Sequence, residues 1–304
     1  MSLYNKYRPS TFAELVGNET TVESLSNFLK NKSTCPHTFL LHGATGCGKT
    51  TIGRIIAKEL GCSNNDLREI NTANFRGIDT IREIIQQSQF KPLEGDTRVW
   101  IIDECHKLTT DAQNASLKIL EEPPKHVYFV LCTTEPQKLL DTIKGRCSQF
   151  PVSVLNDKQM FSLLHHIIKE EGESIQKIVY DQIIQDSLGH PRNAIQILEQ
   201  VFQVSPDKRL EMAKRSAEEQ SESIELCRLL LKQGTPWKQI ATVLLKLKEQ
   251  EAESIRRHVL RYCQAILLKG ENDLAAKVIE AFYEPFYATG YPGLIYACYT
   301  ITNG

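Results

Sequence analysis

The segment from Gly43 to Thr51 carries the clearest chemistry in the sequence, because it fits the phosphate-binding pattern G-x-x-x-x-G-K-[ST]. Its glycines let the backbone curl so that successive N–H groups point at an anion. In such a loop, Lys49 reaches the β- and γ-phosphates of a nucleotide, and the Thr50 hydroxyl ligates Mg²⁺. The nucleotide-binding residues predicted from this segment are Gly43, Thr45, Gly46, Cys47, Gly48, Lys49, Thr50 and Thr51.

Two acidic residues end a later apolar stretch and complete the chemistry that a P-loop requires. Asp103 and Glu104 follow directly after the apolar residues 99–102. In P-loop ATPases an Asp at this place holds the Mg²⁺ shell, and a neighbouring Glu can act as general base toward the attacking water. The alternative is that both acids only end the strand in solvent, which the upstream P-loop makes the weaker interpretation.

Three further polar residues are candidates for contact with the γ-phosphate. Thr134 follows the next apolar stretch, so it is expected between the two acids and the phosphate. Arg146 and Arg192 are candidates because arginine stabilises charge on phosphoryl oxygens. From these residues alone, an ordinary turn hydroxyl and ordinary surface arginines remain open as alternatives.

The elements that must position these residues alternate between apolar strands and amphipathic helices. Strands are predicted over 37–41, 67–71, 98–104 and 127–132, and helices over 18–32, 51–60, 79–90 and 110–121. Such alternation indicates an α/β fold with a parallel sheet covered on both faces. Ligands bind these sheets at the carboxyl ends of the strands, where the P-loop, the two acids and Thr134 all fall.

After about residue 154 only helical spacing remains. Helices are predicted over 160–171, 180–188, 191–202, 224–233, 237–249, 253–269 and 273–287. The polar stretches 205–208 and 218–223 indicate a domain joint, and the aromatic tail 282–299 is apolar enough that we expect it to pack.

Composition excludes several classes of protein. The 304 residues are 41% hydrophobic and 24% charged, as in ordinary globular domains. The nine cysteines are far apart without a Cys-x-x-Cys pair, which predicts reduced thiols and no zinc site. No apolar run approaches a membrane span and the start is polar, so we expect a cytoplasmic protein without membrane contact. With a net charge of −1, nucleic-acid binding would require basic residues gathered on one surface or pooled between copies.

Two helix starts are candidate sites for a DNA phosphate. One lies at Gly77–Thr80 beside Arg76 and the other at 107–110, and helix N-termini present free N–H groups to anions. The predicted DNA-binding residues are Arg76, Gly77, Ile78, Asp79, Thr80, Lys107 and Thr110. Ordinary capped helices, or a nucleotide phosphate, are the alternatives.

Several motifs together resemble the AAA+ ATPase subunits of sliding-clamp loaders, above all the gamma/tau subunit of bacterial DNA polymerase III. These motifs lie at residues 6–9, 16–19, 103–106, 120–124, 133–139 and 145–147. The segment 71–82 also looks like the small subunits of replication factor C. The resemblance covers about residues 1–200, whereas residues 216–304 match only in length and helical pattern.

The resemblance implies a role for each matching position. Asp103 and Glu104 would form the Walker B motif, Thr134 sensor 1 and Arg192 sensor 2, while Arg146 would be an arginine finger acting on a neighbouring subunit's ATP. Residues bordering the adenine would be Tyr7, Arg8 and Val16. Arg76 matches a basic residue that, in related loaders, links DNA contact to the Walker B Glu.

The end of the helix over 79–90 is implied to dock on the sliding clamp, with Ile85, Gln89 and Phe90 as the predicted contacts. Exposed aromatic residues make good anchors for a hydrophobic pocket. The alternative is that Phe90 folds back into the domain core.

By the same resemblance the chain would have a RecA-like ATPase domain (1–155), a helical lid (156–215) and a helical collar (216–304). The implied function is a clamp loader that uses ATP and Mg²⁺ to open a sliding clamp and load it onto primer-template DNA. Its partners would be the clamp, the DNA, copies of itself, a distinct fifth subunit and, indirectly, DNA polymerase. The implied location is the replication fork, in the cytoplasm of a bacterium or of a virus-infected host.

The sequence departs from the family pattern at two places. Only Cys62 remains where gamma/tau subunits carry a zinc module, and Gly145 replaces the usual Ser before the arginine finger.

Two rival functions are another AAA+ machine, such as a branch-migration motor or replication initiator, and a nonhydrolysing subunit that binds ATP for assembly. The intact Lys49 and Glu104 argue against the second rival.

Overall fold

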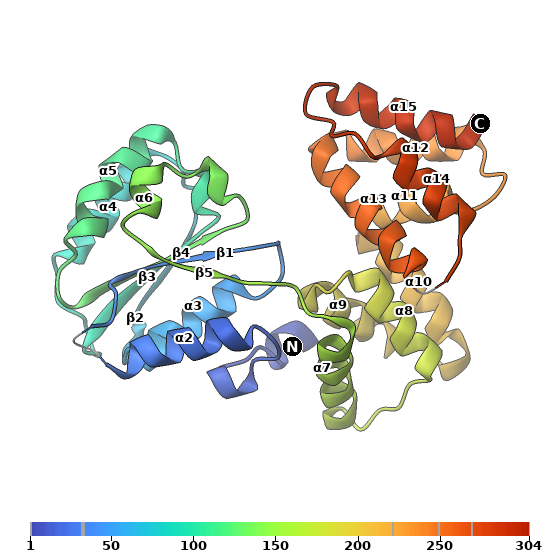
Figure 1. Ribbon diagram of the computed structural model, residues 1–304. Coiled ribbons are helices and arrows are strands. Elements are labelled where there is room, and N and C mark those ends of the chain that lie inside the picture. Colours follow the sequence, from blue (N-terminus) through green and yellow to red (C-terminus); the bar gives the residue numbers. More distant parts are fainter. Residues whose placement is uncertain (1, 32–33, 221, 249, 269, 304) are drawn as a thin grey trace. The chain divides into compact units, whose positions relative to one another are not determined.

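The computed structural model describes residues 2–31, 34–220, 222–248, 250–268 and 270–303. Contacts divide the chain into two compact units (Figure 1). The first contains residues 3–159 together with 190–192, and the second contains residues 160–189 and the chain from 193 onward. Each unit is described by itself.

A five-stranded parallel sheet forms the centre of the first unit, as the alternating pattern predicted. Its strands are β1 (Thr38–His42), β2 (Cys62–Asn71), β3 (Thr97–Asp103), β4 (Val127–Thr133) and β5 (Ser148–Pro151), in the order β2-β3-β4-β1-β5. Each neighbouring pair is parallel. The carboxyl ends of β1, β3 and β4 therefore lie at the same edge of the sheet.

Helices cover both faces of this sheet (Figure 1). Helices α2 (Glu19–Lys30) and α3 (Lys49–Glu59) bury Leu25 and Ile52 against one face. Helices α4 (Ile78–Ser88), α5 (Thr110–Glu121) and α6 (Asp141–Lys144) bury Ile81, Ile119 and Ile143 against the other. Short helices α1 (Leu3–Lys6), η1 (Phe12–Glu14), η2 (Cys105–Lys107) and η3 (Pro136–Lys138) complete the unit.

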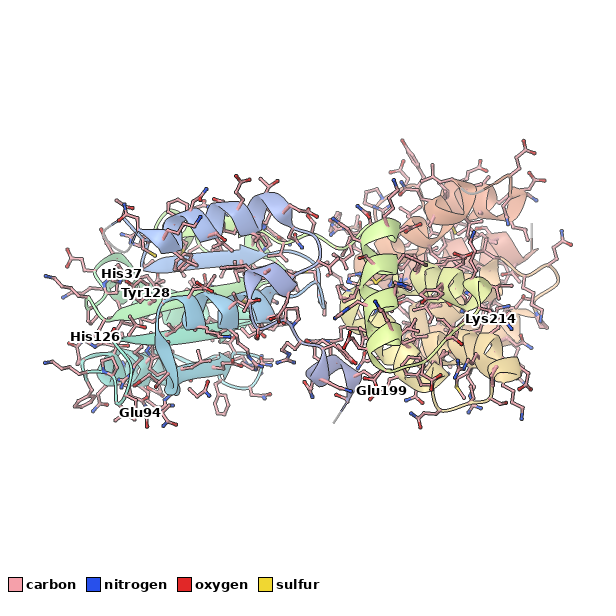
Figure 2. All side chains as sticks on the ribbon, turned by 90° about the horizontal axis from the view of Figure 1, so that it is seen from below. His37, Glu94, His126, Tyr128, Glu199 and Lys214 are labelled. Atoms are coloured by element: carbon pink, nitrogen blue, oxygen red, sulfur yellow. The ribbon has the colours of Figure 1, made fainter. Side chains whose placement is uncertain are left out.

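An aromatic pair marks the amino-terminal edge of the sheet. The ring of His37, just before β1, stacks on Tyr128 in β4 with centroids 4.3 Å apart (Figure 2). The His37 Nδ1 atom also lies 2.7 Å from the Val127 carbonyl oxygen. The start of β1 is thus tied to the start of β4, at the edge opposite to the P-loop.

The second unit consists of helices in its described residues. They are α7 (Asp157–Glu170), α8 (Lys177–Ser187), α9 (Pro191–Val201), η4 (Pro206–Lys208), α10 (Arg209–Gln220), α11 (Glu222–Leu230), α12 (Trp237–Leu247), α13 (Ala252–Leu267), α14 (Asp273–Ala281) and α15 (Gly290–Asn303). The first residues of α7 and α9 belong to the first unit. None of the helices described is both long and apolar enough to cross a bilayer. The boundary between lid and collar near residue 215 stays a prediction.

The structure corrects several predicted elements. Strand β5 was missed because Phe150 is the one buried residue among its four, so no apolar run marks it. Strand β2 begins at Cys62 instead of residue 67, since this edge strand is mostly polar. Helix α10 occupies part of the expected joint and packs against α8 and α11.

The last helix predicted from the sequence, over 273–287, is shorter in the structure, where α14 ends at Ala281. The aromatic tail packs in part, with Phe282 and Phe286 buried while Tyr283 and Tyr287 are exposed. The predicted helix ends at 32, 249 and 269 lie outside the described residues.

Candidate nucleotide-binding site

The P-loop connects β1 to α3 and depends on its glycines. Gly43, Gly46 and Gly48 have φ values of 153°, 72° and 104°, a region that side-chain-bearing residues rarely adopt. A Cβ atom on Gly43 would lie 2.0 Å from the Val152 carbonyl oxygen. Gly48 is the N-cap of α3 and supplies no side-chain cap, so the first N–H groups of this helix are left to bind an anion.

The Lys49 ammonium group lies inside this loop, where it bonds to backbone carbonyl oxygens. Lys49 is only 5% exposed, and its Nζ donates to the carbonyl oxygens of Gly43 at 2.9 Å and Ala44 at 2.8 Å. Within the described chain no carboxylate pairs with it. Because an uncompensated buried charge is costly, this arrangement suits an anionic ligand such as a nucleotide phosphate.

Thr50 and Asp103 come together from α3 and β3. The Thr50 hydroxyl donates to Asp103 Oδ2 at 2.8 Å, and both oxygens are of the hard type that Mg²⁺ prefers. The described residues contain no group of three or more His, Cys, Asp or Glu that could hold a metal ion. Mg²⁺ is usually bound through one or two protein oxygens together with phosphate oxygens and water, and the Thr50–Asp103 pair fits this pattern.

Glu104 has an unusual backbone conformation. Its φ of 54° and ψ of 36° place it in the left-handed region, which costs a non-glycine residue about 1–3 kcal/mol. The buried Thr72 at the end of β2 holds this turn, since its hydroxyl donates to the carbonyl oxygens of Asp103 at 3.0 Å and Glu104 at 2.6 Å. Thr134 Oγ1 lies 3.5 Å from Glu104 Oε2. The two predicted residues Glu104 and Thr134 thus meet at one carboxylate oxygen.

The pocket at this edge brings together residues that lie far apart in the sequence. It is lined by Tyr4, Thr45, Gly46, Gly48, Lys49, Thr50, Thr51, Asp103, Glu104 and Arg192. Arg192 Nη2 donates to the Tyr4 hydroxyl at 3.1 Å, with its guanidinium 5.0 Å from the centre of the same ring. Tyr4 was missed from the sequence, where it is one of two tyrosines near the amino terminus and carries no motif of its own.

Some predicted ligand residues do not line this pocket. Tyr7, Arg8 and Val16 lie outside it, although the Arg8 guanidinium approaches the Tyr4 ring at 4.8 Å. Their assignment to the adenine stays a prediction. The Cys47 side chain is buried, and burial raises the pKa of its thiol, so any ligand contact at this position would come from the backbone.

Arg146 is held away from this pocket. Its Nε and Nη2 donate to Glu121 Oε2 at 2.9 and 2.6 Å, and its Nη1 donates to the Thr142 carbonyl oxygen at 2.9 Å. Arg146 does not line the pocket of its own chain. This placement is compatible with the predicted action on a neighbouring subunit.

The two helix starts predicted to bind DNA lie side by side. The Thr109 N–H donates to the Arg76 carbonyl oxygen at 3.0 Å, which connects the start of α5 to the residue just before α4. Gly77, the N-cap of α4, supplies no side-chain cap, whereas Thr109 caps α5 through the Ala112 N–H. The described residues around these starts are mostly exposed, including Arg76, Gly77, Asp79, Lys107 and Thr110.

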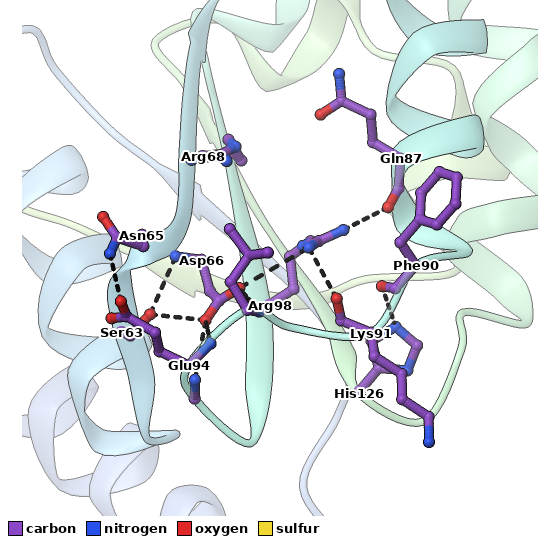
Figure 3. Close-up of polar contacts among 12 residues, drawn as sticks. Ser63, Asn65, Asp66, Arg68, Gln87, Phe90, Lys91, Glu94, Arg98 and His126 are labelled. Atoms are coloured by element: carbon purple, nitrogen blue, oxygen red, sulfur yellow. Dashed lines mark hydrogen bonds and ion pairs between the residues drawn. The ribbon is translucent and has the colours of Figure 1, made fainter.

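Two of the three residues predicted to bind a clamp, Gln89 and Phe90, follow α4, which ends at Ser88. Phe90 is 62% exposed and Leu93 is 70% exposed, so Phe90 does not fold back into the core. Arg98 Nη2 donates to the Lys91 carbonyl oxygen at 3.1 Å, and His126 Nε2 lies 2.9 Å from the Phe90 carbonyl oxygen (Figure 3). Of the other predicted contacts, Ile85 is half-buried against the sheet and Gln89 is exposed.

A buried carboxylate fixes the rest of this loop. Asp66 is fully buried, and its side chain accepts hydrogen bonds from the N–H groups of Leu93 at 2.5 Å, Glu94 at 3.0 Å and Gly95 at 2.9 Å (Figure 3). Burial alone raises the pKa of Asp66, but hydrogen bonds from Ser63 and these three N–H groups outweigh it and hold the pKa far below its usual range. The exposed side chains of Phe90 and Leu93 therefore project from a backbone that these hydrogen bonds hold in place.

Comparison with known proteins supports the sequence resemblance. A family model described as DNA polymerase III, delta subunit matches residues 65–156. The gamma/tau subunit of DNA polymerase III from Mycobacterium tuberculosis is 36% identical over 230 residues, which cover 68% of this chain and 40% of that protein. The Buchnera aphidicola gamma subunit is 29% identical over 354 residues, covering 95% of both.

The tau subunit of Escherichia coli is 35% identical over 221 residues, which cover 66% of this chain and 34% of tau. The chain thus spans less than half the length of the mycobacterial and Escherichia coli relatives. The resemblance to clamp-loader ATPase subunits that the motifs predicted is confirmed by these similarities.

A solved structure also shares the fold. The Thermotoga maritima RuvB Holliday junction branch migration motor has a TM-score of 0.59 and 19% sequence identity, covering 88% of this chain and 87% of its own. At this identity the likeness shows that the two chains share a fold and says nothing further about activity.

Proposed function

We propose that this chain, an AAA+ relative of the gamma and tau subunits of DNA polymerase III, is the ATP-hydrolysing subunit of a clamp loader. It would open a sliding clamp and load it onto primer-template DNA for processive replication. The observation that supports this most directly is the buried Lys49, which has no carboxylate partner among the described residues and lies beside the Thr50–Asp103 pair and Glu104.

Each residue of the pocket would have a defined part in hydrolysis. Lys49 and the P-loop N–H groups would bind the phosphates of the substrate ATP, and Thr50 and Asp103 would hold Mg²⁺, which neutralises phosphate charge when bound. The Glu104 carboxylate would take a proton from the attacking water. Thr134 would orient the water or the Glu104 carboxylate, and Arg192 would contact the phosphates.

Assembly would complete the site. Arg146 would act on the ATP of a neighbouring subunit, because it does not line its own pocket. We propose that copies of this chain and a distinct further subunit form a ring. The helix starts at Gly77 and Thr109 would hold DNA phosphates, and Phe90 would bind the clamp.

Steady-state ATP hydrolysis by the complex that co-purifies with this chain tests the proposal. We expect turnover to rise when primed DNA and the clamp are added together. Lys49→Ala should abolish ATP binding, whereas Glu104→Gln should bind ATP but hydrolyse it roughly 10²–10⁴-fold more slowly. Normal turnover in Glu104→Gln would remove the general base from the mechanism, and no turnover at all in the wild-type complex would indicate a subunit that binds ATP only for assembly.

The same assay separates the proposal from a branch-migration motor. The fold is shared with RuvB, so the fold does not decide between the two activities. Stimulation of hydrolysis by a four-way DNA junction, without any effect of the clamp, would favour the motor.

A further inference from the structure

A buried histidine joins the end of β3 to the end of β4 beside the proposed general base. The His106 side chain, in η2, is only 1% exposed. Its Nδ1 lies 3.0 Å from Thr133 Oγ1. Its Nε2 lies 3.4 Å from Glu104 Oε2 and 3.3 Å from Glu135 Oε1. One imidazole nitrogen is therefore shared by two carboxylates.

The hydrogen-bond partners assign the proton on this ring. Thr133 Oγ1 accepts the Glu135 N–H at 3.0 Å, and its own hydroxyl proton can be donated to His106 Nδ1. If Nδ1 carried the ring proton instead, a bare Nε2 lone pair would face two carboxylates, which is repulsive. We therefore assign the proton to Nε2, where it can be donated to Glu104 or to Glu135.

Burial favours the neutral form of this imidazole. Burial lowers the pKa of His106, although the charges of Glu104 and Glu135 act in the opposite direction. Glu135 remains ionised because the hydrogen bond and charge of Lys138, whose Nζ lies 2.7 Å from Glu135 Oε2, outweigh burial and lower its pKa. A single N–H donor thus faces two carboxylate oxygens, at 3.4 and 3.3 Å.

We propose that His106 is a positioning residue for the Glu104 carboxylate, and that Glu135 competes for the same Nε2–H. Glu104 Oε2 faces both His106 and Thr134, whereas the described structure records no hydrogen bond to Oε1. The bond from His106 would therefore fix one oxygen and present the other toward the pocket. This inference rests on the proposed role of Glu104 in ATP hydrolysis.

The sharpest test compares two amide substitutions in the co-purified complex. The Gln side chain of His106→Gln places an N–H donor near the Nε2 position, whereas the shorter side chain of His106→Asn reaches only the Nδ1 position beside Thr133. We expect His106→Asn to lower kcat by about 10- to 100-fold, as expected for a misplaced catalytic group. His106→Gln should restore most of this loss, and KM should change little in both variants.

A double-mutant cycle tests the competition from Glu135. Glu135→Gln should leave kcat at or above the wild-type value in the presence of His106 and should have no effect in the His106→Asn background. His165→Gln is the matched control, because this histidine is exposed on α7 and does not line the pocket. Its kcat should equal that of the wild type.

Distinct results would overturn the inference and the proposed function. If Glu104→Gln loses turnover while His106→Asn keeps it, Glu104 is the base and His106 does not position it. Equal losses in His106→Asn and His106→Gln, accompanied by a lower Tm, would show that His106 only stabilises the fold. Should Glu104→Gln retain full turnover, the general-base role fails and the inference about His106 fails with it.

Discussion

Replacement of Phe90 by Ala gives the most direct test of the proposed clamp contact. Phe90 is 62% exposed, which corresponds to roughly 120 Å² of accessible surface if a phenylalanine buries about 200 Å². At about 25 cal/mol per Å², covering this area contributes roughly 3 kcal/mol. Since Ala retains its Cβ, we expect a loss of about 2–3 kcal/mol, or roughly 30- to 150-fold in Kd.

Surface plasmon resonance with immobilised sliding clamp from the same replication system measures this loss. The fold should be unaffected, because exposed substitutions change the free energy of unfolding by less than about 0.5 kcal/mol. Phe75→Ala is the matched control, since Phe75 is 60% exposed but lies between β2 and α4 instead of in the loop after α4. It should leave the Kd for the clamp unchanged.

Two results would refute this reasoning about Phe90. The first is a Kd for Phe90→Ala equal to that of Phe75→Ala, which would place the clamp contact elsewhere. The second is a clear drop in Tm with unchanged affinity per folded molecule, which would mean that Phe90 supports the domain instead of a partner.

Three other predictions concern assembly, DNA and stability. Arg146→Ala should lower ATP turnover in the assembled ring by ~10³–10⁵-fold and leave the low turnover of the isolated chain unchanged; fast turnover by an isolated monomer would contradict action in trans. DNA affinity, measured by fluorescence anisotropy, should fall steeply with salt and vary little with base sequence, and a strong preference for one sequence would exclude binding through phosphates. Asp66→Asn should destabilise the protein by roughly 3 kcal/mol at neutral pH. Folding lowers the pKa of Asp66, so the Asp66 carboxylate contributes to the free energy of unfolding above the ordinary Asp pKa, and this contribution declines as the pH falls below it. In urea unfolding, the difference in stability between Asp66→Asn and the wild type should therefore shrink at acidic pH.

The sequence predicted the parts of the fold that local patterns encode. The strands β1, β3 and β4 are buried along most of their length and each contains a run of apolar residues, and the P-loop glycines are required by backbone geometry, so both leave a clear pattern. Strand β5 and the first half of β2 leave no such pattern in the sequence, because edge strands need few buried side chains.

The missed parts of the site depend on contacts between distant segments. Tyr4 meets Arg192 across 188 residues, and Thr72 reaches Glu104 across 32 residues. No local spacing predicts such contacts, because folding alone brings the segments together. His106 lay inside a motif that the sequence had already singled out, yet its partners Thr133 and Glu135 became evident only at the meeting of β3 and β4.

The loop that carries Phe90 has a consequence for the thermodynamics of association. Ordering the backbone of one residue costs about 1–2 kcal/mol in conformational entropy. In this loop the backbone is already ordered when the protein folds. Asp66 accepts hydrogen bonds from the N–H groups of residues 93–95, and the side chains of Arg98 and His126 bond the carbonyl oxygens of Lys91 and Phe90, respectively. A partner would dock on a segment that is already ordered. In the free protein the amides of residues 93–95 already donate to the buried Asp66 carboxylate. Binding of a partner should therefore bring these amides little additional protection from hydrogen exchange.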